Sequence, residues 1–345
     1  MRILLIDNLL IRRYGKLRMG PGRALACGAI RGNHRLCEFS DRDLARYMGF
    51  GIQKLGERLV NQALIKTAVN FRPEAILIGH CDFIRNETLH IIRERLPNVR
   101  IAHFNVDPMC DAHPQAQMRE RMESCDALFA TTAGAEYLKP FLTGKNIVAY
   151  MPNPSDTELE TLDKSARPSN DFSVDLFYAG QPRTGDPRLD FVNRLATALT
   201  DKPIRFELVG MGGRPAVVGG ADYDDLLASA KMGLNINRYF GMKWYSSDRI
   251  AHLMGSGLLT AVYDGDQMQQ FFSDKEVLYY HDVPDLVDKL LRIQSDDTDR
   301  RAIAAAGRAR YHQLFSGERT LNFMLETLFE RPYSSEYEWQ AEVYR

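Results

Sequence analysis

The stretch YSSDRIAHLMGSG combines residue types that could bind an anion. Ser246, Ser247 and Asp248 are types favoured at the start of a helix. A short helix that begins there places Arg249 and His252 on one face, because these residues are three positions apart. Its first turn would present backbone N–H groups and the positive end of the helix dipole to a phosphate group. An ordinary solvated surface helix is the alternative interpretation.

Glycine and arginine residues follow other apolar runs in the same half of the chain. Glycine lets the backbone approach a ligand closely, and arginine can donate two parallel hydrogen bonds to phosphate oxygens. The same residues could instead form tight turns with solvated arginines, and they match neither a dinucleotide fingerprint nor a Walker A motif. With the polar residues around the end of MGLNINR, the further candidates for nucleotide binding are Gly180, Arg183, Arg188, Gly210, Asn235, Asn237 and Arg238.

Polar residues also follow apolar runs in the first half of the chain. His80 and Asp82 come at the end of AILIGHCD, and Asn105 and Asp107 come at the end of RIAHFNVD. A carboxylate or an imidazole at such a position could remove a proton from a substrate hydroxyl. The basic first loop, which includes Arg18, could meet an acidic acceptor or a lipid headgroup, or could be a solvated face.

The spacing of Asp264 and Asp266 could hold a divalent metal ion. No third carboxylate is close to this pair in the sequence, so we interpret it as a turn between a strand and a helix. The eight histidines show no metal-binding spacing, and no nucleophile elbow is present. We therefore expect no metal and no other cofactor.

Short apolar runs alternate with longer amphipathic segments along the chain, which predicts an α/β fold with doubly wound, mostly parallel sheets. The segment 151–171 is rich in Pro, Ser and Asp and is the expected linker. It separates a Rossmann-like domain, residues 1–150, from a second one, residues 172–325. Residues 326–345 form a tail in which we expect a helix that returns to the first domain. The expected strands are residues 2–7, 35–40, 75–80, 100–107, 127–132 and 146–151, followed by 174–180, 204–210, 232–238, 258–264 and 277–282.

The composition is that of an ordinary globular protein, with 45% hydrophobic residues, 26% charged residues and a net charge of −1. This balanced charge gives no support for nucleic-acid binding or for a general membrane role. The sequence has no run of 18 apolar residues, and we expect its start, MRILLIDN, to be a strand rather than a signal peptide. Five cysteines without a CxxC pair favour reduced thiols in the cytoplasm.

Several strings of the second half together resemble one protein family: DLFYAG, DYDDLLASAKMGLNINR, SSDRIAHLMGSGLLTAVYDGDQMQQFFSDKEVLYYHDVPDLVDKLL and RRAIAAAGRARYHQLFS. They are similar to two-domain GT-B glycosyltransferases of group 1 type, in the branch similar to spore maturation protein B (CgeB-like). The resemblance covers residues 175–315 well. The first half matches only in outline, through MRILLID, HFNVDP and LFATTAGAEYL.

The resemblance implies two domains that face a central cleft and transfer a sugar from a nucleotide-sugar donor without a metal. The acceptor would be a glycan, a lipid-linked molecule or a protein. The helix that starts after Ser247 would hold the diphosphate, Arg249 would stabilise the leaving group, and His252 would reach the ribose or the α-phosphate. On the acceptor side, the candidate base is Asp107, followed by His80 and Asp82, with Asn105 and Arg18 nearby. The enzyme would be cytoplasmic, with at most a peripheral contact to the inner face of the membrane.

This sequence departs from the family at two positions. Related retaining enzymes carry glutamates where this chain has His252 and, eight residues earlier, Trp244. The departure leaves the stereochemistry, the donor sugar and catalysis itself open. A nucleotide-sugar sensor without turnover and a sugar-nucleotide epimerase of GT-B shape are therefore the alternative functions.

Overall fold

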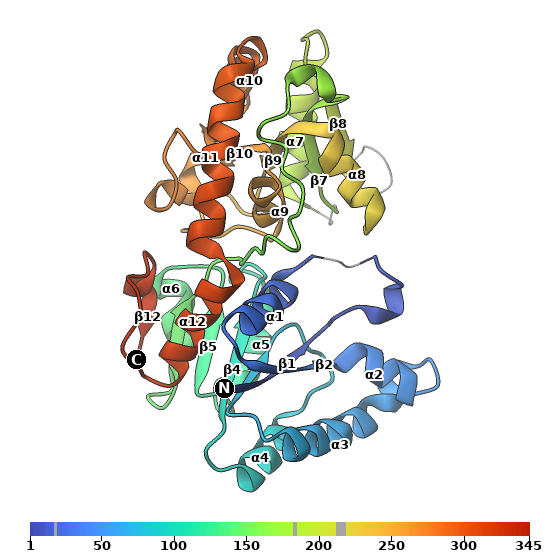
Figure 1. Cartoon of the computed structure of the whole chain (residues 1–345), viewed down its shortest axis with the longest axis vertical. Coiled ribbons are helices and arrows are strands. Elements are labelled where there is room, and N and C mark those ends of the chain that lie inside the picture. Colours follow the sequence, from blue (N-terminus) through green and yellow to red (C-terminus); the bar gives the residue numbers. More distant parts are fainter. Residues whose placement is uncertain (17–18, 182–184, 212–218) are drawn as a thin grey trace. The chain divides into compact units, whose positions relative to one another are not determined.

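The computed structural model describes residues 1–16, 19–181, 185–211 and 219–345 (Figure 1). The chain divides into two compact units. The first unit is formed by Met1–Pro154 together with Ser316–Arg345, and the second unit is Ser155–Phe315. The expected linker therefore contributes most of its residues to the second unit. The return of the chain to the first unit begins at Ser316, ahead of the expected tail.

The first unit contains a seven-stranded sheet with the order β12-β6-β5-β4-β3-β1-β2. All neighbours are parallel except β12, which pairs antiparallel with β6 at the edge. Its strands are β1 (Arg2–Asp7), β2 (Arg35–Ser40), β3 (Ala75–Ile78), β4 (Arg100–Asn105), β5 (Ala127–Ala130), β6 (Ile147–Tyr150) and β12 (Val343–Tyr344). Its α-helices are α1 (Pro21–Arg31), α2 (Asp41–Met48), α3 (Gln53–Phe71), α4 (Asn86–Arg95), α5 (Ala112–Arg121), α6 (Ala135–Leu138) and α12 (Gly317–Leu328).

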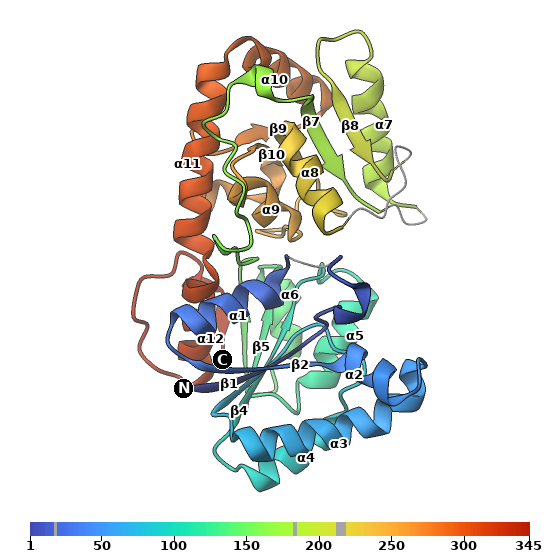
Figure 2. The ribbon, with the colours of Figure 1, turned by 45° about the vertical axis from the view of Figure 1, so that its right-hand side comes forward.

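Helices cover both faces of this sheet, which explains why β1, β3, β4 and β5 are almost continuous apolar runs. The helices α1 and α12 pack against each other, and α3 packs against α4 (Figure 2). The contact between α1 and α12 depends on glycine, because a methyl group at Gly28 would overlap the backbone of Gly317. The segment that ends the chain is thus part of the core of the first unit.

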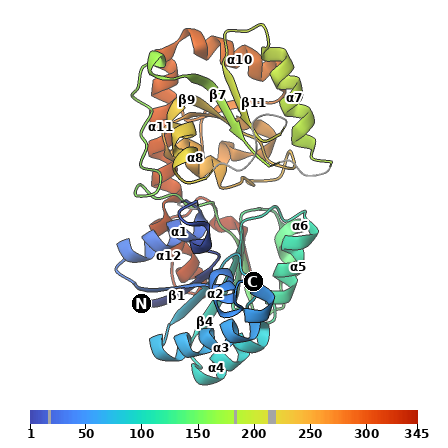
Figure 3. The ribbon, with the colours of Figure 1, turned by 90° about the vertical axis from the view of Figure 1, so that its right-hand side faces the viewer.

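The second unit contains a five-stranded parallel sheet with the order β11-β10-β9-β7-β8 (Figure 3). One face packs on α7 and α10 through a core that includes Leu176, Leu195, Leu234 and Leu290. The strands are β7 (Val174–Ala179), β8 (Phe206–Val209), β9 (Ala230–Asn235), β10 (Leu259–Tyr263) and β11 (Leu278–Tyr280). The helices are α7 (Pro187–Leu199), α8 (Ala221–Ser229), α9 (Arg249–Gly255), α10 (Val283–Ser295) and α11 (Asp297–Phe315).

Both sheets reverse their strand order once. In the first unit the chain goes from β1 to β2 and then to β3 on the other side of β1. In the second unit it goes from β7 to β8 and then to β9 on the other side of β7. Such a reversal opens a crevice outside the carboxyl ends of the two central strands, where ligands bind in open α/β sheets. The fold therefore directs attention to the ends of β1 and β3 and to the ends of β7 and β9.

The predicted α/β class with two parallel, Rossmann-like sheets is confirmed. Each expected strand is present, with ends that differ by a few residues. The sequence did not predict β12 or α2, because a strand of two residues and a helix of eight carry too little periodicity. No helix within the described residues combines the length and the apolar character needed to cross a membrane.

Candidate functional site

Arg249 links the ends of β7 and β9 in the second unit. Its Nε donates to the carbonyl oxygen of Ala179 at 2.9 Å, and its Nη1 donates to that of Ile236 at 3.0 Å. The guanidinium also lies over the ring of Tyr178, 4.8 Å from the ring centre. Arg249 therefore stands at the predicted place, and part of its hydrogen-bonding capacity holds the two strand ends together.

Asn237 organises the loop between β9 and α9. Its Nδ2 donates to Tyr245 O and to Asp266 Oδ2, both at 2.7 Å, and its Oδ1 accepts from the N–H of Ser247 at 3.3 Å. Asp266 also accepts from the N–H of Gly241, and burial raises its pKa to about 7. The pair Asp264–Asp266 forms a 3-10 turn, as expected, and Asp266 supports this loop.

The start of α9 is closed by the chain itself. The N–H of Ser247 is bonded to Asn237, and the N–H of Ile250 is bonded to Ser247 O. The helix is also short, with α9 limited to Arg249–Gly255. We expected these N–H groups to be exposed to a diphosphate, and the structure instead uses two of them in the loop. With these two N–H groups engaged, the charged and polar side chains at the ends of β7 and β9 are the main groups that could contact an anion here.

Three buried polar atoms at this edge have no hydrogen-bond partner among the residues that the structure describes: Asn235 Nδ2, Ser247 Oγ and the hydroxyl of Tyr178. Asn235 ends β9, Ser247 precedes α9, and Tyr178 is near the end of β7. A buried polar group without a partner costs stability, and native structures seldom keep several of them together. Their position at the crevice indicates a place where a polar ligand binds.

His252 is held between two carboxylates. Its Nδ1 lies 3.1 Å from Glu160 Oε1, and its Nε2 lies 3.8 Å from Asp248 Oδ2. Burial lowers the pKa of His252, but the hydrogen bonds to Asp248 and Glu160 outweigh burial and raise the pKa to about 9. His252 is thus an imidazolium at neutral pH. Sequence reasoning missed Glu160, which lies 92 residues away in the expected linker.

The other predicted donor-side residues have mixed surroundings. Arg188 is buried and forms a forked pair with Asp186, the residue that caps α7, so its charge is already neutralised. Gly210 follows β8 with a positive φ of 72°, and Gly180 donates its N–H to Val209 O. Arg238 lies just after β9, while Arg183 lies outside the described residues, as does Arg18 of the acceptor side.

In the first unit, the crevice at the ends of β1 and β3 brings together two of the predicted residues. His80 Nδ1 lies 4.0 Å from Asp107 Oδ2, and both side chains are partly exposed. The backbone of His80 is fixed by Asp7, which accepts its N–H at 2.9 Å. Asp107 donates its own N–H to Asn105 Oδ1 at 2.8 Å. A carboxylate and an imidazole thus stand where a substrate hydroxyl could reach them.

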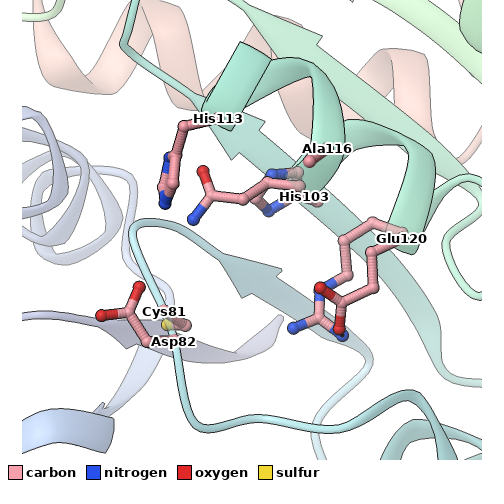
Figure 4. Close-up of a pocket in the computed structure, with 8 residues that line it drawn as sticks. Cys81, Asp82, His103, His113, Ala116 and Glu120 are labelled. Carbon is pink, nitrogen blue, oxygen red and sulfur yellow. Dashed lines mark ion pairs between the residues drawn. The ribbon is translucent and has the colours of Figure 1, made fainter.

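A pocket of about 340 Å³ lies beside this crevice, between α5 and the segment after β3 (Figure 4). Asp82 lines one side, where it is bound to Arg42 at 2.6 Å. Figure 4 shows His113 and Glu120 of α5 on the other side. The full lining is Cys81, Asp82, His103, His113, Ala116, Gln117, Glu120 and Arg121.

His103 lies in the wall of this pocket and is almost completely buried. Its Nδ1 donates to Ile78 O at 3.0 Å, because a carbonyl oxygen can only accept. Burial, aided by the charge of Arg121, lowers the pKa of His103 to about 3. The ring is therefore neutral, and Nε2 is a buried acceptor without a partner in the described part of the chain. Sequence reasoning missed His103, although a histidine inside an apolar strand was a visible signal.

In the described residues, neither unit brings potential metal ligands together. Within residues 1–16, 19–181, 185–211 and 219–345, no group of three or more His, Cys, Asp or Glu side chains has the arrangement of a metal site. None of the five cysteines, which all lie in the described part of the chain, forms a disulfide, and burial raises the pKa of Cys125 to about 12.

Comparison with known proteins bears on both units. Residues 187–326 match the protein family described as "Glycosyl transferase-like". No curated protein sequence matches the chain. Sucrose-phosphate synthase from Thermosynechococcus elongatus has a similar structure, with a TM-score of 0.63 and 13% identity, over 96% of this chain and 98% of that chain.

Two further structures are similar at the same low level of identity. HepE from Anabaena, in complex with UDP and glucose, has a TM-score of 0.59 and 13% identity, over 96% of this chain and 100% of that chain. A UDP-forming α,α-trehalose-phosphate synthase from Burkholderia xenovorans has a TM-score of 0.54 and 12% identity, over 97% and 99%. The chain has the GT-B fold, and its match to the glycosyl transferase-like family covers residues 187–326.

Proposed function

We propose that the protein is a glycosyltransferase that moves a sugar from a nucleotide-sugar donor to a hydroxyl group of an acceptor. The observation that carries this proposal is the set of three unpartnered buried atoms, on Tyr178, Asn235 and Ser247, at the crevice of the second unit. A bound nucleotide would supply the hydrogen bonds that these atoms lack. The match of residues 187–326 to a glycosyl transferase-like family supports the same assignment.

The donor would lie at the ends of β7 and β9. Arg249 supplies positive charge at this edge, which suits a diphosphate that gains negative charge as it leaves, whereas the charge of His252 is balanced by Glu160 and Asp248. HepE is solved with UDP, and the Burkholderia synthase is UDP-forming, so UDP-sugars are the first donors to test. We propose that no metal is needed, because Asp266 is engaged with Asn237 and Gly241.

The acceptor would bind to the first unit, at the pocket lined by His103. Because Nε2 of His103 is a neutral acceptor, it fits a hydroxyl group as its partner. Asp107 lies beside His80 and outside the lining of this pocket, and we propose that it takes the proton of the attacking hydroxyl. A glycan, a lipid-linked molecule or a protein could each supply that hydroxyl, and membership of the CgeB-like branch remains a prediction. Because its cysteines form no disulfide, we propose that the protein works in the reducing cytoplasm.

The reaction would form one bond and break one bond. The acceptor oxygen attacks the anomeric carbon, and the bond from that carbon to the diphosphate oxygen breaks with its electron pair going to the diphosphate. The proton of the acceptor hydroxyl passes to Asp107 if the configuration inverts. If the configuration is retained, the leaving diphosphate can take this proton, and Asp107 only positions the acceptor.

The test begins with the donor. The full chain is screened by thermal shift against UDP-, GDP-, ADP- and CMP-sugars, and nucleotide release is then followed with and without candidate acceptors. Release that depends on an acceptor supports the transferase. Conversion of the donor into another sugar nucleotide would show an epimerase, and binding without either reaction would show a sensor. Turnover that chelators abolish would contradict metal independence.

The hydroxyl of Ser247 provides a specific variant for this test. Because Ser247 Oγ has no partner among the described residues, Ser247→Ala removes no intramolecular hydrogen bond from the structure. We expect unchanged thermal stability and nucleotide affinity lower by roughly five- to tenfold. The control is Ser295→Ala, at an exposed serine at the end of α10 whose hydroxyl donates to Arg292 O and is not among the candidate binding groups. Equal affinity of Ser247→Ala and wild type would remove Ser247 from the site.

A further inference from the structure

The hairpin formed by α2 and α3 exposes large apolar side chains. None of them is among the residues proposed for donor or acceptor binding. Between residues 47 and 59, the exposed fractions are 82% for Tyr47, 97% for Phe50, 59% for Ile52, 65% for Leu55 and 45% for Leu59. Single exposed apolar residues are common, but a contiguous group of this kind marks a contact surface. We call residues 46–59 the hairpin tip.

The hairpin tip is built so that its apolar side chains cannot turn inward. The backbones of α2 and α3 touch through small residues, since a methyl group at Gly56 would overlap Ala45 O and one at Gly49 would overlap Ile52 O. Ala45, Gly49 and Gly56 are all buried. The inner side of the hairpin is therefore filled by backbone and small residues, and most large apolar side chains of the tip are exposed.

Phe50 shows a conflict between local conformation and residue type. Its φ is 52°, a left-handed conformation that suits glycine or asparagine and is disfavoured for a bulky residue. Its side chain is the most exposed of the large apolar ones. A phenyl ring that costs conformational energy and packs on nothing in the described chain contributes no stability to the isolated fold. Such conflicts are expected at functional positions.

Basic residues outnumber acidic ones in the hairpin formed by α2 and α3. From residue 44 to residue 72 the chain has a single acidic residue, Glu57, which pairs with Arg85 at 2.7 Å. The same stretch carries five basic residues: Arg46, Lys54, Arg58, Lys66 and Arg72. All five are exposed. Three of them, Arg46, Lys54 and Arg58, lie in the hairpin tip, while Lys66 lies further along α3 and Arg72 just after its end, so the tip has a local excess of positive charge on a chain whose net charge is only −1.

The segment after β1, residues 10–16, extends this surface. Asp43, in the first turn of α2, accepts the N–H groups of Ile11 at 2.8 Å and Arg12 at 3.0 Å. Ile11 and Tyr14 in this segment are also exposed. Figure 2 shows α2 and α3 at one end of the first unit, next to the edge strand β2. The surface lies wholly within the first unit.

We propose that the hairpin tip docks the protein on an anionic lipid bilayer. Apolar side chains on a rigid tip can enter the interface between headgroups and acyl chains, while Lys and Arg extend their charged ends to lipid phosphates. Tyr47 suits the same interface, because its ring is apolar and its hydroxyl is polar. A protein partner would need matching acidic groups around a shaped apolar site, whereas a bilayer accepts exposed tips of any shape. This inference does not depend on glycosyl transfer.

The test is sedimentation of the full chain with lipid vesicles. Wild type should bind vesicles of one part phosphatidylglycerol to two parts phosphatidylcholine, bind less as salt rises, and bind little to phosphatidylcholine alone. Phe50→Asn should be folded and at least as heat-stable as wild type, because asparagine tolerates the positive φ. Its binding to anionic vesicles should nevertheless fall roughly tenfold or more.

Two further variants complete the design. Neutralising Arg46, Lys54 and Arg58 with glutamine should weaken binding by roughly fivefold for each charge. Ile30→Ser is the matched control, since Ile30 is exposed to 65%, like Leu55, but lies on α1; it should bind as wild type does. Absence of preference for anionic vesicles, or unchanged binding by Phe50→Asn, would overturn the proposal. Self-association in solution that Phe50→Asn abolishes, with no vesicle binding, would instead identify a protein-docking surface.

Discussion

Each unit contains a buried histidine near its candidate binding groups, and the two histidines have different charge states. His252 in the second unit is bonded to Glu160 and lies near Asp248, which raise its pKa to about 9. His103 in the first unit is bonded to a backbone carbonyl, and burial with the nearby charge of Arg121 lowers its pKa to about 3. Burial acts in the same direction on both, so the partners decide the difference.

This difference shows how similar sheets can serve unlike ligands. The imidazolium of His252 directs its two ring N–H groups to Glu160 and Asp248, so we expect His252 to support donor binding by fixing the start of α9. The neutral ring of His103 offers a lone pair, so it suits a hydroxyl or amide proton. We therefore expect substitutions in the two units to separate donor binding from acceptor binding, and the following predictions test that separation.

The largest expected effect is on transfer. Asp107→Asn keeps the shape of the side chain but removes its basicity, so an inverting enzyme should lose roughly 10²–10⁴-fold in kcat. Donor affinity, measured by calorimetry, should stay at the wild-type value, because Asp107 lies in the first unit. A loss of less than about tenfold in kcat would indicate retention of configuration, or would remove Asp107 as the base.

The second effect is on the stability of the second unit. Glu160→Ala leaves the His252 imidazolium buried with one partner fewer, and breaking a buried pair costs about 3–5 kcal/mol. The free energy of unfolding should fall toward that extent in denaturant titration, and the pKa of His252 in NMR should drop. The control is Asp190→Asn, which breaks an exposed pair with Arg194 and should cost less than about 1 kcal/mol. Equal losses in both variants would show that the buried pair has no special role.

Opposite pH dependences should follow from the two histidines. The folded pKa of His252, about 9, lies above its unfolded value, so its contribution is present below about pH 6.5 and is lost as pH rises through 9. The folded pKa of His103, about 3, lies below its unfolded value, so its contribution is present above about pH 6.5 and is lost as pH falls toward 3.

The check compares each histidine with its glutamine variant across this range. His252→Gln should remove an alkaline slope of up to about 1.4 kcal/mol per pH unit, and His103→Gln should remove an acidic slope of the same size. Unfolding is followed separately for each transition, because a chain with two units need not unfold in one step. Slopes of the same sign in both pairs would contradict the assigned charge states.

The smallest expected effect is on acceptor binding. His103→Leu removes the buried acceptor atom together with the hydrogen bond that Nδ1 donates to Ile78 O. We expect the KM for the acceptor to rise roughly five- to tenfold, with some loss of thermal stability. Donor affinity should not change. His252→Gln should show the reverse pattern, with weaker nucleotide binding and an acceptor KM near wild type. If both variants weaken the same substrate, the two histidines do not divide the ligands between them.

Much of the fold was readable from the sequence. Runs such as RILLID, AILI and LTAVY are mostly apolar, which predicts strands buried on both faces, and helical periodicity between them predicts parallel sheets. Polar residues at the ends of these runs, including Asn235, Asp107 and His80, could be assigned to ligand-binding edges, because parallel strands bring their carboxyl ends to one side. These inferences depend only on local pattern and sheet geometry.

The charge states and the pairings were decided by tertiary structure. Glu160 is 92 residues from His252, so no local pattern could predict that a carboxylate of the expected linker makes this histidine cationic. The sequence also could not distinguish Asn237, whose Nδ2 donates to Asp266, from Asn235, whose Nδ2 has no partner in the described part of the chain. The two asparagines lie only two residues apart at the same strand end. The physical reason is that pKa values and hydrogen-bond satisfaction depend on burial and on partners brought together only by folding.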